Sequence, residues 1–153
     1  MILFHGSTVP IEKVDLSKSR PNKDFGRAFY LSDNEQQAIA MAGFKALTVG
    51  GIRVVTSFAF EDDGTLNIKR FDAYTEDWAD FVFNNRDERQ NYSHPYDIVY
   101  GPIANDTVGV QIRDLRERKI SLQTFLENLR YHKGITFQYA FCSPLAISKL
   151  IKL

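Results

Sequence analysis

The stretch Lys23-Asp24-Phe25-Gly26-Arg27-Ala28-Phe29-Tyr30-Leu31-Ser32 combines a bend, a short strand and the start of a helix. Gly26 permits the positive φ that a tight bend requires, and an apolar, β-prone run follows it. Ser32 with Glu35 three residues later has the pattern of a capping box, which predicts a helix starting at Ser32. Tyr30 lies just before this junction. Its side chain is either an ordinary half-buried aromatic or a group that faces a site.

The remaining sequence predicts strands and helices without a regular alternation. The segments 52–60 and 66–71 are rich in β-formers and flank a turn at 62–64, which predicts a hairpin. Thr75, Ser121 and Ser143 have the pattern of helix N-caps, the last with proline at the next position. The expected strands are 2–4, 28–31, 52–60, 66–71, 96–103 and 136–141. The expected helices are 33–47, one that starts at Thr75, 105–118, one from Ser121 to Gly134, and a short one after Ser143. This order favours an α+β fold over a doubly wound sheet.

Length and composition indicate one domain that spans the whole chain, residues 1–153. Lysine plus arginine and aspartate plus glutamate number 19 each, so the net charge does not favour nucleic acid or an anionic membrane. A single cysteine, Cys142, excludes an intrachain disulfide and fits a reducing compartment. No apolar run approaches the roughly 18 residues of a membrane span. We therefore expect a cytoplasmic protein without membrane partners.

Polar residues within apolar strands are the candidates for function. The sequence has no phosphate-binding glycine loop, and His5, His94 and His132 lack metal-ligand spacing, so no metal is expected. His94 precedes a proline in a polar loop and is expected to be exposed. His5, Tyr30 and Gln138 each end or interrupt an apolar strand. A polar group in such a place either faces water at a sheet edge or faces partners in a site.

Three short segments resemble the motifs of the His-Tyr-Glu class of ADP-ribosyltransferases, which is related to diphtheria toxin. They are Phe4-His5-Gly6-Ser7, Phe25 to Ser32, and Phe137-Gln138-Tyr139-Ala140-Phe141. The whole chain more closely resembles a family of small bacterial domains of unknown function with this fold, which are often toxins of toxin–antitoxin pairs. Residues 15–20, Trp78 with Phe81-Val82, and residues 96–102 carry that likeness.

The resemblance implies two small, mainly antiparallel sheets that flank a cleft for NAD, the co-substrate, with surrounding helices. His5 would bind the adenosine ribose, the Gly6 backbone would meet the nicotinamide amide, and Tyr30 would stack on the nicotinamide ring. Arg20 or Lys23 could meet the diphosphate, on the basis of charge and loop position. The implied NAD-binding set is His5, Gly6, Ser7, Arg20, Lys23, Phe29 and Tyr30, and the implied catalytic set is His5, Tyr30 and Gln138.

Two residues depart from the motifs of the class. Ala28 stands where the second motif usually has glycine, and Gln138 stands where the third has glutamate. A glutamine can bind a ribose hydroxyl but cannot supply a negative charge, which favours transfer of one ADP-ribose unit over repeated addition. The expectation is a mono-ADP-ribosyltransferase, a bacterial toxin that acts on a protein or nucleic acid, with a possible antitoxin partner. The alternatives are an NAD glycohydrolase, a non-catalytic NAD or ADP-ribose binding module, and a purely structural domain.

Overall fold

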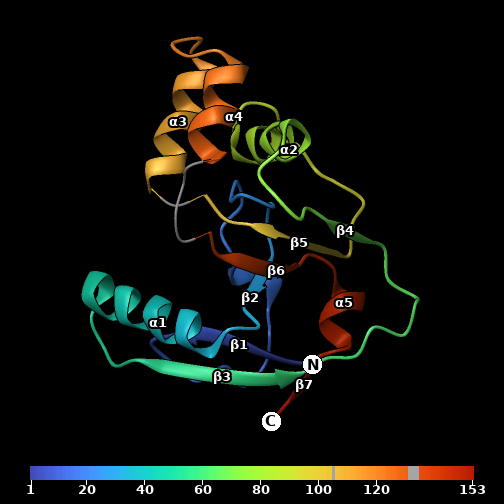
Figure 1. Cartoon of the computed structure of the whole chain (residues 1–153). Coiled ribbons are helices and arrows are strands. Elements are labelled where there is room, and N and C mark those ends of the chain that lie inside the picture. The colour runs from blue at the N-terminus through green and yellow to red at the C-terminus, as the bar shows by residue number, and fades with distance from the viewer. Residues whose placement is uncertain (105, 131–134) are drawn as a thin grey trace.

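Two small β-sheets divide the protein into layers (Figure 1), as a computed structural model that describes residues 1–104, 106–130 and 135–153 shows. The three-stranded sheet has the order β1 (Ile2–Ser7), β3 (Val54–Ala59), β7 (Ile151–Lys152). The four-stranded sheet has the order β2 (Phe29–Leu31), β6 (Phe137–Phe141), β5 (Ile98–Pro102), β4 (Ile68–Arg70). The protein is thus a small α+β domain.

The helices lie on different sides of these sheets (Figure 1). Helix α1 (Glu35–Val49) packs on β1 of the three-stranded sheet. Helices α2 (Glu76–Arg86), α3 (Asp106–Arg116) and α4 (Leu122–Arg130) gather beyond the four-stranded sheet, and α5 (Pro144–Ser148) lies beside it. A short 3-10 helix covers Leu16–Lys18. No helix within the described ranges has both the length and the apolar character needed to cross a lipid bilayer.

Alternating side chains of the four-stranded sheet contribute to two separate cores. One core lies between the sheets and the other lies between the four-stranded sheet and helices α2 to α4. On β6, Tyr139 and Phe141 enter the first core and Ala140 enters the second, as the two-residue period of a strand requires. On β2, Leu31 belongs to the first core and Tyr30 packs against the second. The two faces of β2 and β6 therefore pack against different neighbours.

The predicted hairpin of 52–60 with 66–71 is wrong. Strand β3 pairs on one side with β1 and on the other with β7, so neither of its edges is left for β4. Strand β4 instead pairs parallel with β5, from Ile68 opposite Ile98 to Arg70 opposite Tyr100. The segment between β3 and β4 therefore connects the two sheets.

The predicted cap of α1 is also displaced. Asn34, not Ser32, is the N-cap, because its side-chain oxygen accepts the N–H groups of Gln36 and Gln37. Ser32 still belongs to the sheet region, where its backbone pairs with Phe4 and its hydroxyl accepts the Asn34 N–H at 2.9 Å. Helix α1 consequently begins at Glu35.

The other predicted caps are confirmed. The hydroxyls of Thr75, Ser121 and Ser143 each accept the N–H three residues later, at 3.2, 3.1 and 3.1 Å. The strands predicted at 96–103 and 136–141 correspond to β5 and β6. The predicted helix end at Gly134, and His132, lie outside the described residues.

Candidate functional site

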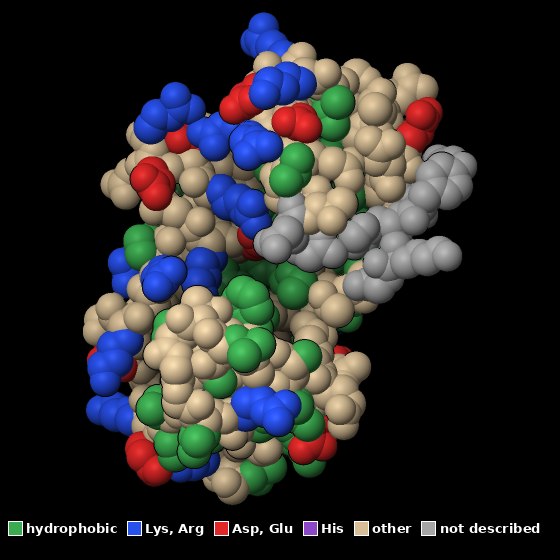
Figure 2. Space-filling model, turned by 90° about the vertical axis from the view of Figure 1, so that its left-hand side faces the viewer, with side chains coloured by type: hydrophobic (Ala, Val, Ile, Leu, Met, Phe, Trp, Pro, Cys, Tyr) green, Lys and Arg blue, Asp and Glu red, His purple; other side chains and the backbone are tan. Residues whose placement is uncertain are grey.

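An open cleft of about 1270 Å³ is bordered by β1, the loop that follows it, β2 and α1. Figure 2 shows this hollow at the waist of the molecule, with hydrophobic side chains in its floor and lysine and arginine side chains at its margin. The cleft brings together all the residues that the sequence singled out for NAD. Its lining includes His5, Gly6, Ser7, Arg20, Lys23, Phe29, Tyr30 and Gln138.

His5 is fixed in one tautomer. Its Nδ1 lies 2.7 Å from the carbonyl oxygen of Tyr30, and because a carbonyl only accepts, Nδ1 carries the proton and donates. Burial lowers the pKa of His5 to about 4, and the charges of Lys45 and Lys23 act in the same direction. Near neutral pH the imidazole is therefore uncharged, and Nε2 is an acceptor that suits a ligand hydroxyl.

Tyr30 uses its hydroxyl to hold the bend before it. The hydroxyl donates to the carbonyl of Gly26 at 2.8 Å and accepts the N–H of Phe25 at 3.1 Å. Burial raises the pKa of Tyr30 well above its ordinary value, so the phenol stays protonated. Gly26 has a φ of +85°, as the bend requires. The Lys23 ammonium lies 5.2 Å from the centre of the Tyr30 ring, which shows that a face of this ring accepts a cation.

Gly6 presents its backbone to the cleft. Phe4 exchanges both backbone hydrogen bonds with Ser32, at 2.7 and 2.9 Å. Because the bonding direction repeats every second residue of a strand, the N–H and C=O of Gly6 point the same way, away from β3. The Gly6 carbonyl accepts the Lys45 ammonium at 2.8 Å. A side chain at Gly6 would collide with α1, since a Cβ there would lie 2.0 Å from the Ala38 carbonyl oxygen.

Gln138 lies opposite Gly101 in the pairing of β6 with β5. The alternation along β6 directs Gln138 to the same side as Ala140, the side on which Tyr30 packs. Gln138 is half-buried, and its amide hydrogen-bonds to none of the described residues. Its donors and its acceptor are thus available to a ligand.

Two of the predicted NAD-binding residues are engaged within the protein. Ser7 donates its hydroxyl to the carbonyl of Val9 at 2.5 Å. Phe29 is buried behind His5, with the two rings stacked at 4.3 Å, and meets Phe58 edge-on at 5.7 Å. Phe29 therefore supports the position of the His5 ring.

Four residues that shape the cleft were missed by sequence reasoning: Asp24, Arg27, Lys45 and Arg86. Asp24 binds Arg86 at 2.5 Å and accepts the Ala104 N–H at 2.9 Å, so it joins the bend to α2 and to the end of β5. Arg27 donates to the carbonyls of Ser17 and Ser19 and thereby holds the loop that carries Arg20. Of these four, only Lys45 could have been singled out from the sequence pattern. It shares a helical face with the buried Ala38 and Ala42, where an apolar residue is expected.

The expectation that His94 is exposed is wrong. The residue is half-buried, with Nε2 donating to the Phe25 carbonyl at 2.9 Å and Nδ1 accepting the Tyr96 N–H at 3.2 Å. Burial lowers the pKa of His94, which favours this neutral form. Cys142 is also half-buried, and burial raises its pKa to about 12, so it is a thiol. No cluster of three His, Cys, Asp or Glu side chains suited to a metal occurs in the part of the chain that the structure describes.

These features define a class of protein, a small α+β domain with an open, lysine- and arginine-rich cleft beside the edge of one of its two sheets. The chain belongs to the family described as "Protein of unknown function (DUF3990)", whose model matches residues 1–152. Neither a curated protein nor a solved structure matches the chain.

Proposed function

We propose that the protein is an NAD-dependent mono-ADP-ribosyltransferase, a bacterial toxin that acts on a protein or a nucleic acid in the cytoplasm. One observation carries the proposal: His5, Tyr30 and Gln138, which lie far apart in the sequence, line the same cleft. The resemblance of their three motifs to the His-Tyr-Glu class supplies the reaction. By the same resemblance we propose a cognate antitoxin protein as a partner.

The chemistry of each group suits a part of NAD. The Nε2 acceptor of His5 suits a ribose hydroxyl, and the Tyr30 ring suits the flat, cationic nicotinamide, because an aromatic face attracts a cation. In the proposed reaction the bond between C1′ of the ribose and the nicotinamide nitrogen breaks, and its electron pair leaves with nicotinamide. The acceptor then bonds to C1′ and loses a proton to solvent.

Gln138 limits the rate that this site can reach. A glutamine can bind the 2′-hydroxyl of the nicotinamide ribose, but it places no negative charge near the positive charge that develops on the sugar. The loss of one well-placed electrostatic group typically costs on the order of 3 kcal/mol, or roughly a hundredfold in rate. The neutral Gln138 therefore favours a second candidate, a module that binds NAD or ADP-ribose without chemistry.

The deciding experiment measures nicotinamide release from labelled NAD, with the purified protein and a cell lysate as the source of acceptors. Wild type is compared with His5→Ala, Tyr30→Ala and Gln138→Ala. Gln90→Ala is the matched control, because Gln90 binds Asp87 at 3.1 Å and is not part of the cleft lining. We expect release and labelling of a macromolecule, both reduced in the three site variants only.

Each of the other outcomes of this experiment indicates a different function. Release that yields only free ADP-ribose indicates an NAD glycohydrolase, in which water is the acceptor. Saturable NAD binding without release indicates the binding module. A protein that neither releases nicotinamide nor gains thermal stability with NAD contradicts both candidates, because a ligand at a hundred times its dissociation constant stabilises by about 2.7 kcal/mol.

A further inference from the structure

The charges along the cleft do not cancel. The cationic residues of its lining are Lys13, Lys18, Arg20, Lys23, Lys45 and Arg86, and the acidic ones are Glu12, Asp15 and Asp24. Each of the three carboxylates is already engaged. Asp24 binds Arg86 at 2.5 Å, Glu12 binds Lys152 at 2.9 Å, and Asp15 accepts the hydroxyl and N–H of Ser17 at 2.6 and 3.0 Å.

Lys23 and Lys45 have no carboxylate partner among the described residues. The Lys45 ammonium donates one hydrogen bond, to the Gly6 carbonyl at 2.8 Å, and an ammonium has three donors. The Lys23 ammonium lies over the Tyr30 ring at 5.2 Å. Lys45 comes from α1 and Lys23 from the loop before β2, so the two residues approach the cleft from different elements.

The charges that act on Lys45 and His5 are positive. Burial, and then the charge of Lys23, lower the pKa of Lys45, and both charges lower the pKa of His5. Burial, and then the charge of Arg20, lower the pKa of Lys23, against the opposing effect of the Asp24 charge. No carboxylate among the described residues forms a salt bridge with Lys23 or Lys45, so an anion placed between the two ammonium groups would interact favourably with both of them.

We propose that Lys45 and Lys23, together with Arg20, form a binding site for a diphosphate group, and that Lys45 is its innermost cation. The identification of the carrier of this diphosphate as NAD rests on the proposed function; the site itself rests on the unpaired cations. Two lysines act as point charges on separate phosphates, whereas Arg20 can form a bidentate contact. Arg86 is not part of the site, because Asp24 neutralises it.

The test measures binding of inorganic pyrophosphate and of ADP by titration calorimetry at two salt concentrations. The variants Lys45→Met and Lys23→Met remove charge and keep an apolar stem, and Lys45→Arg keeps the charge. Lys69→Met is the matched control, because the Lys69 ammonium also lies over an aromatic ring, that of Phe71 at 5.1 Å, and Lys69 is not part of the cleft lining. Lys45→Gln is a second neutral variant that keeps an N–H donor for Gly6.

We expect both ligands to bind about tenfold more weakly to Lys45→Met and Lys23→Met, which corresponds to about 1.4 kcal/mol. Lys45→Gln should behave like Lys45→Met, and Lys45→Arg and Lys69→Met like wild type. The salt dependence of binding should be shallower in the neutral variants, because electrostatic attraction between ligand and site is screened by salt. Absence of pyrophosphate binding in wild type, or equal binding by wild type and the two neutral variants Lys45→Met and Lys45→Gln, overturns the site.

The outcomes separate this site from the proposed function. Lys45-dependent binding of pyrophosphate and ADP, without nicotinamide release from NAD, supports the diphosphate site and contradicts the transferase. Nicotinamide release with the same KM for NAD in wild type and Lys45→Met supports the enzyme and overturns the diphosphate site.

Discussion

Replacement of Tyr30 by phenylalanine separates the two roles that the structure gives this side chain. The Tyr30 hydroxyl satisfies the N–H of Phe25, a fully buried residue, and the carbonyl of Gly26. Without the hydroxyl, a buried N–H loses its partner, which costs about 1–3 kcal/mol. For a chain of this length, each kcal/mol lowers the Tm by about 2–4 °C. The ring itself, the surface that we propose for nicotinamide, stays in place.

The assay combines urea unfolding with nicotinamide release. Tyr30→Phe should lose about 1–3 kcal/mol of unfolding free energy and keep most of the release rate per folded molecule. Tyr30→Ala should lose stability and release together. Tyr92→Phe is the control, because Tyr92 is 39% exposed and lies outside the cleft lining. The reasoning is refuted if Tyr30→Phe abolishes release without loss of stability, since the hydroxyl would then act on the substrate.

Three further predictions test the surroundings of the cleft. Gly6→Ala should lower the unfolding free energy by about 1–3 kcal/mol, because the new Cβ would lie 2.0 Å from the Ala38 carbonyl oxygen. The control Gly109→Ala, within α3, should be neutral or stabilising. Equal losses of unfolding free energy for the two variants in urea titrations would refute the packing argument. As the pH falls from 6.5 to about 4, His5 becomes protonated in the unfolded chain before it does in the folded protein, so the unfolding free energy should fall by at most about 3 kcal/mol. The unfolding free energy of His5→Gln should fall less steeply with pH. If His5→Gln has the same pH profile of stability as wild type, His5 is not the group responsible. Gln138→Glu should raise nicotinamide release by roughly tenfold to a hundredfold, and an unchanged rate would contradict the role proposed for residue 138.

The sequence predicted individual elements better than their partners. Strands β5 and β6 were recognisable because they are nearly continuous apolar runs, and the three helix caps were recognisable because capping is local. The partners of β3 and β4 could not be predicted in the same way, because strand pairing depends on which sheet edges other strands already occupy. Strand β7, which covers only Ile151–Lys152, takes the second edge of β3 and thereby sends β4 to the other sheet.

The cleft was predictable only in part, for a similar reason. The three motif segments name residues that do line one cleft, although composition and periodicity alone could not bring them together. Lys45 and Gly6 are 39 residues apart, and Asp24 and Arg86 are 62 residues apart. The sequence pattern does not show which residue such a side chain contacts across the fold, and the Asp24–Arg86 ion pair is one of these contacts.

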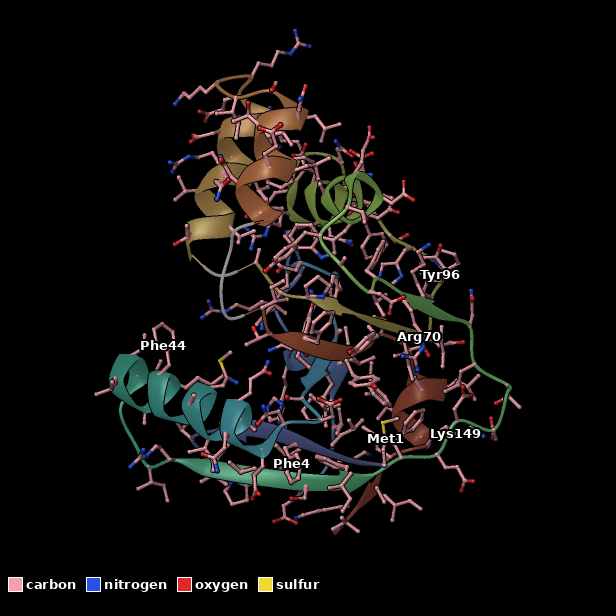
Figure 3. The ribbon with its side chains drawn as sticks, viewed as in Figure 1. Met1, Phe4, Phe44, Arg70, Tyr96 and Lys149 are labelled. Atoms are coloured by element: carbon pink, nitrogen blue, oxygen red, sulfur yellow. The ribbon has the colours of Figure 1, made fainter. Side chains whose placement is uncertain are left out.

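The position of the cleft follows from how β1 and β2 meet. The two strands are bridged at Phe4 and Ser32, and Gly6 lies two residues further along the same edge of β1. A strand edge with unpaired polar groups tends to recruit another strand, and proteins commonly block such an edge with a charged side chain. Lys45 binds the Gly6 carbonyl at that point. The same lysine therefore keeps the strand edge from pairing and places a positive charge within the cleft. In Figure 3, Phe44, the residue before Lys45, stands on the upper side of α1 near its end, and its side chain is 66% exposed. Both properties of Lys45 depend on the absence of a side chain at Gly6, because only then can α1 lie close enough to β1 for the ammonium to reach the carbonyl.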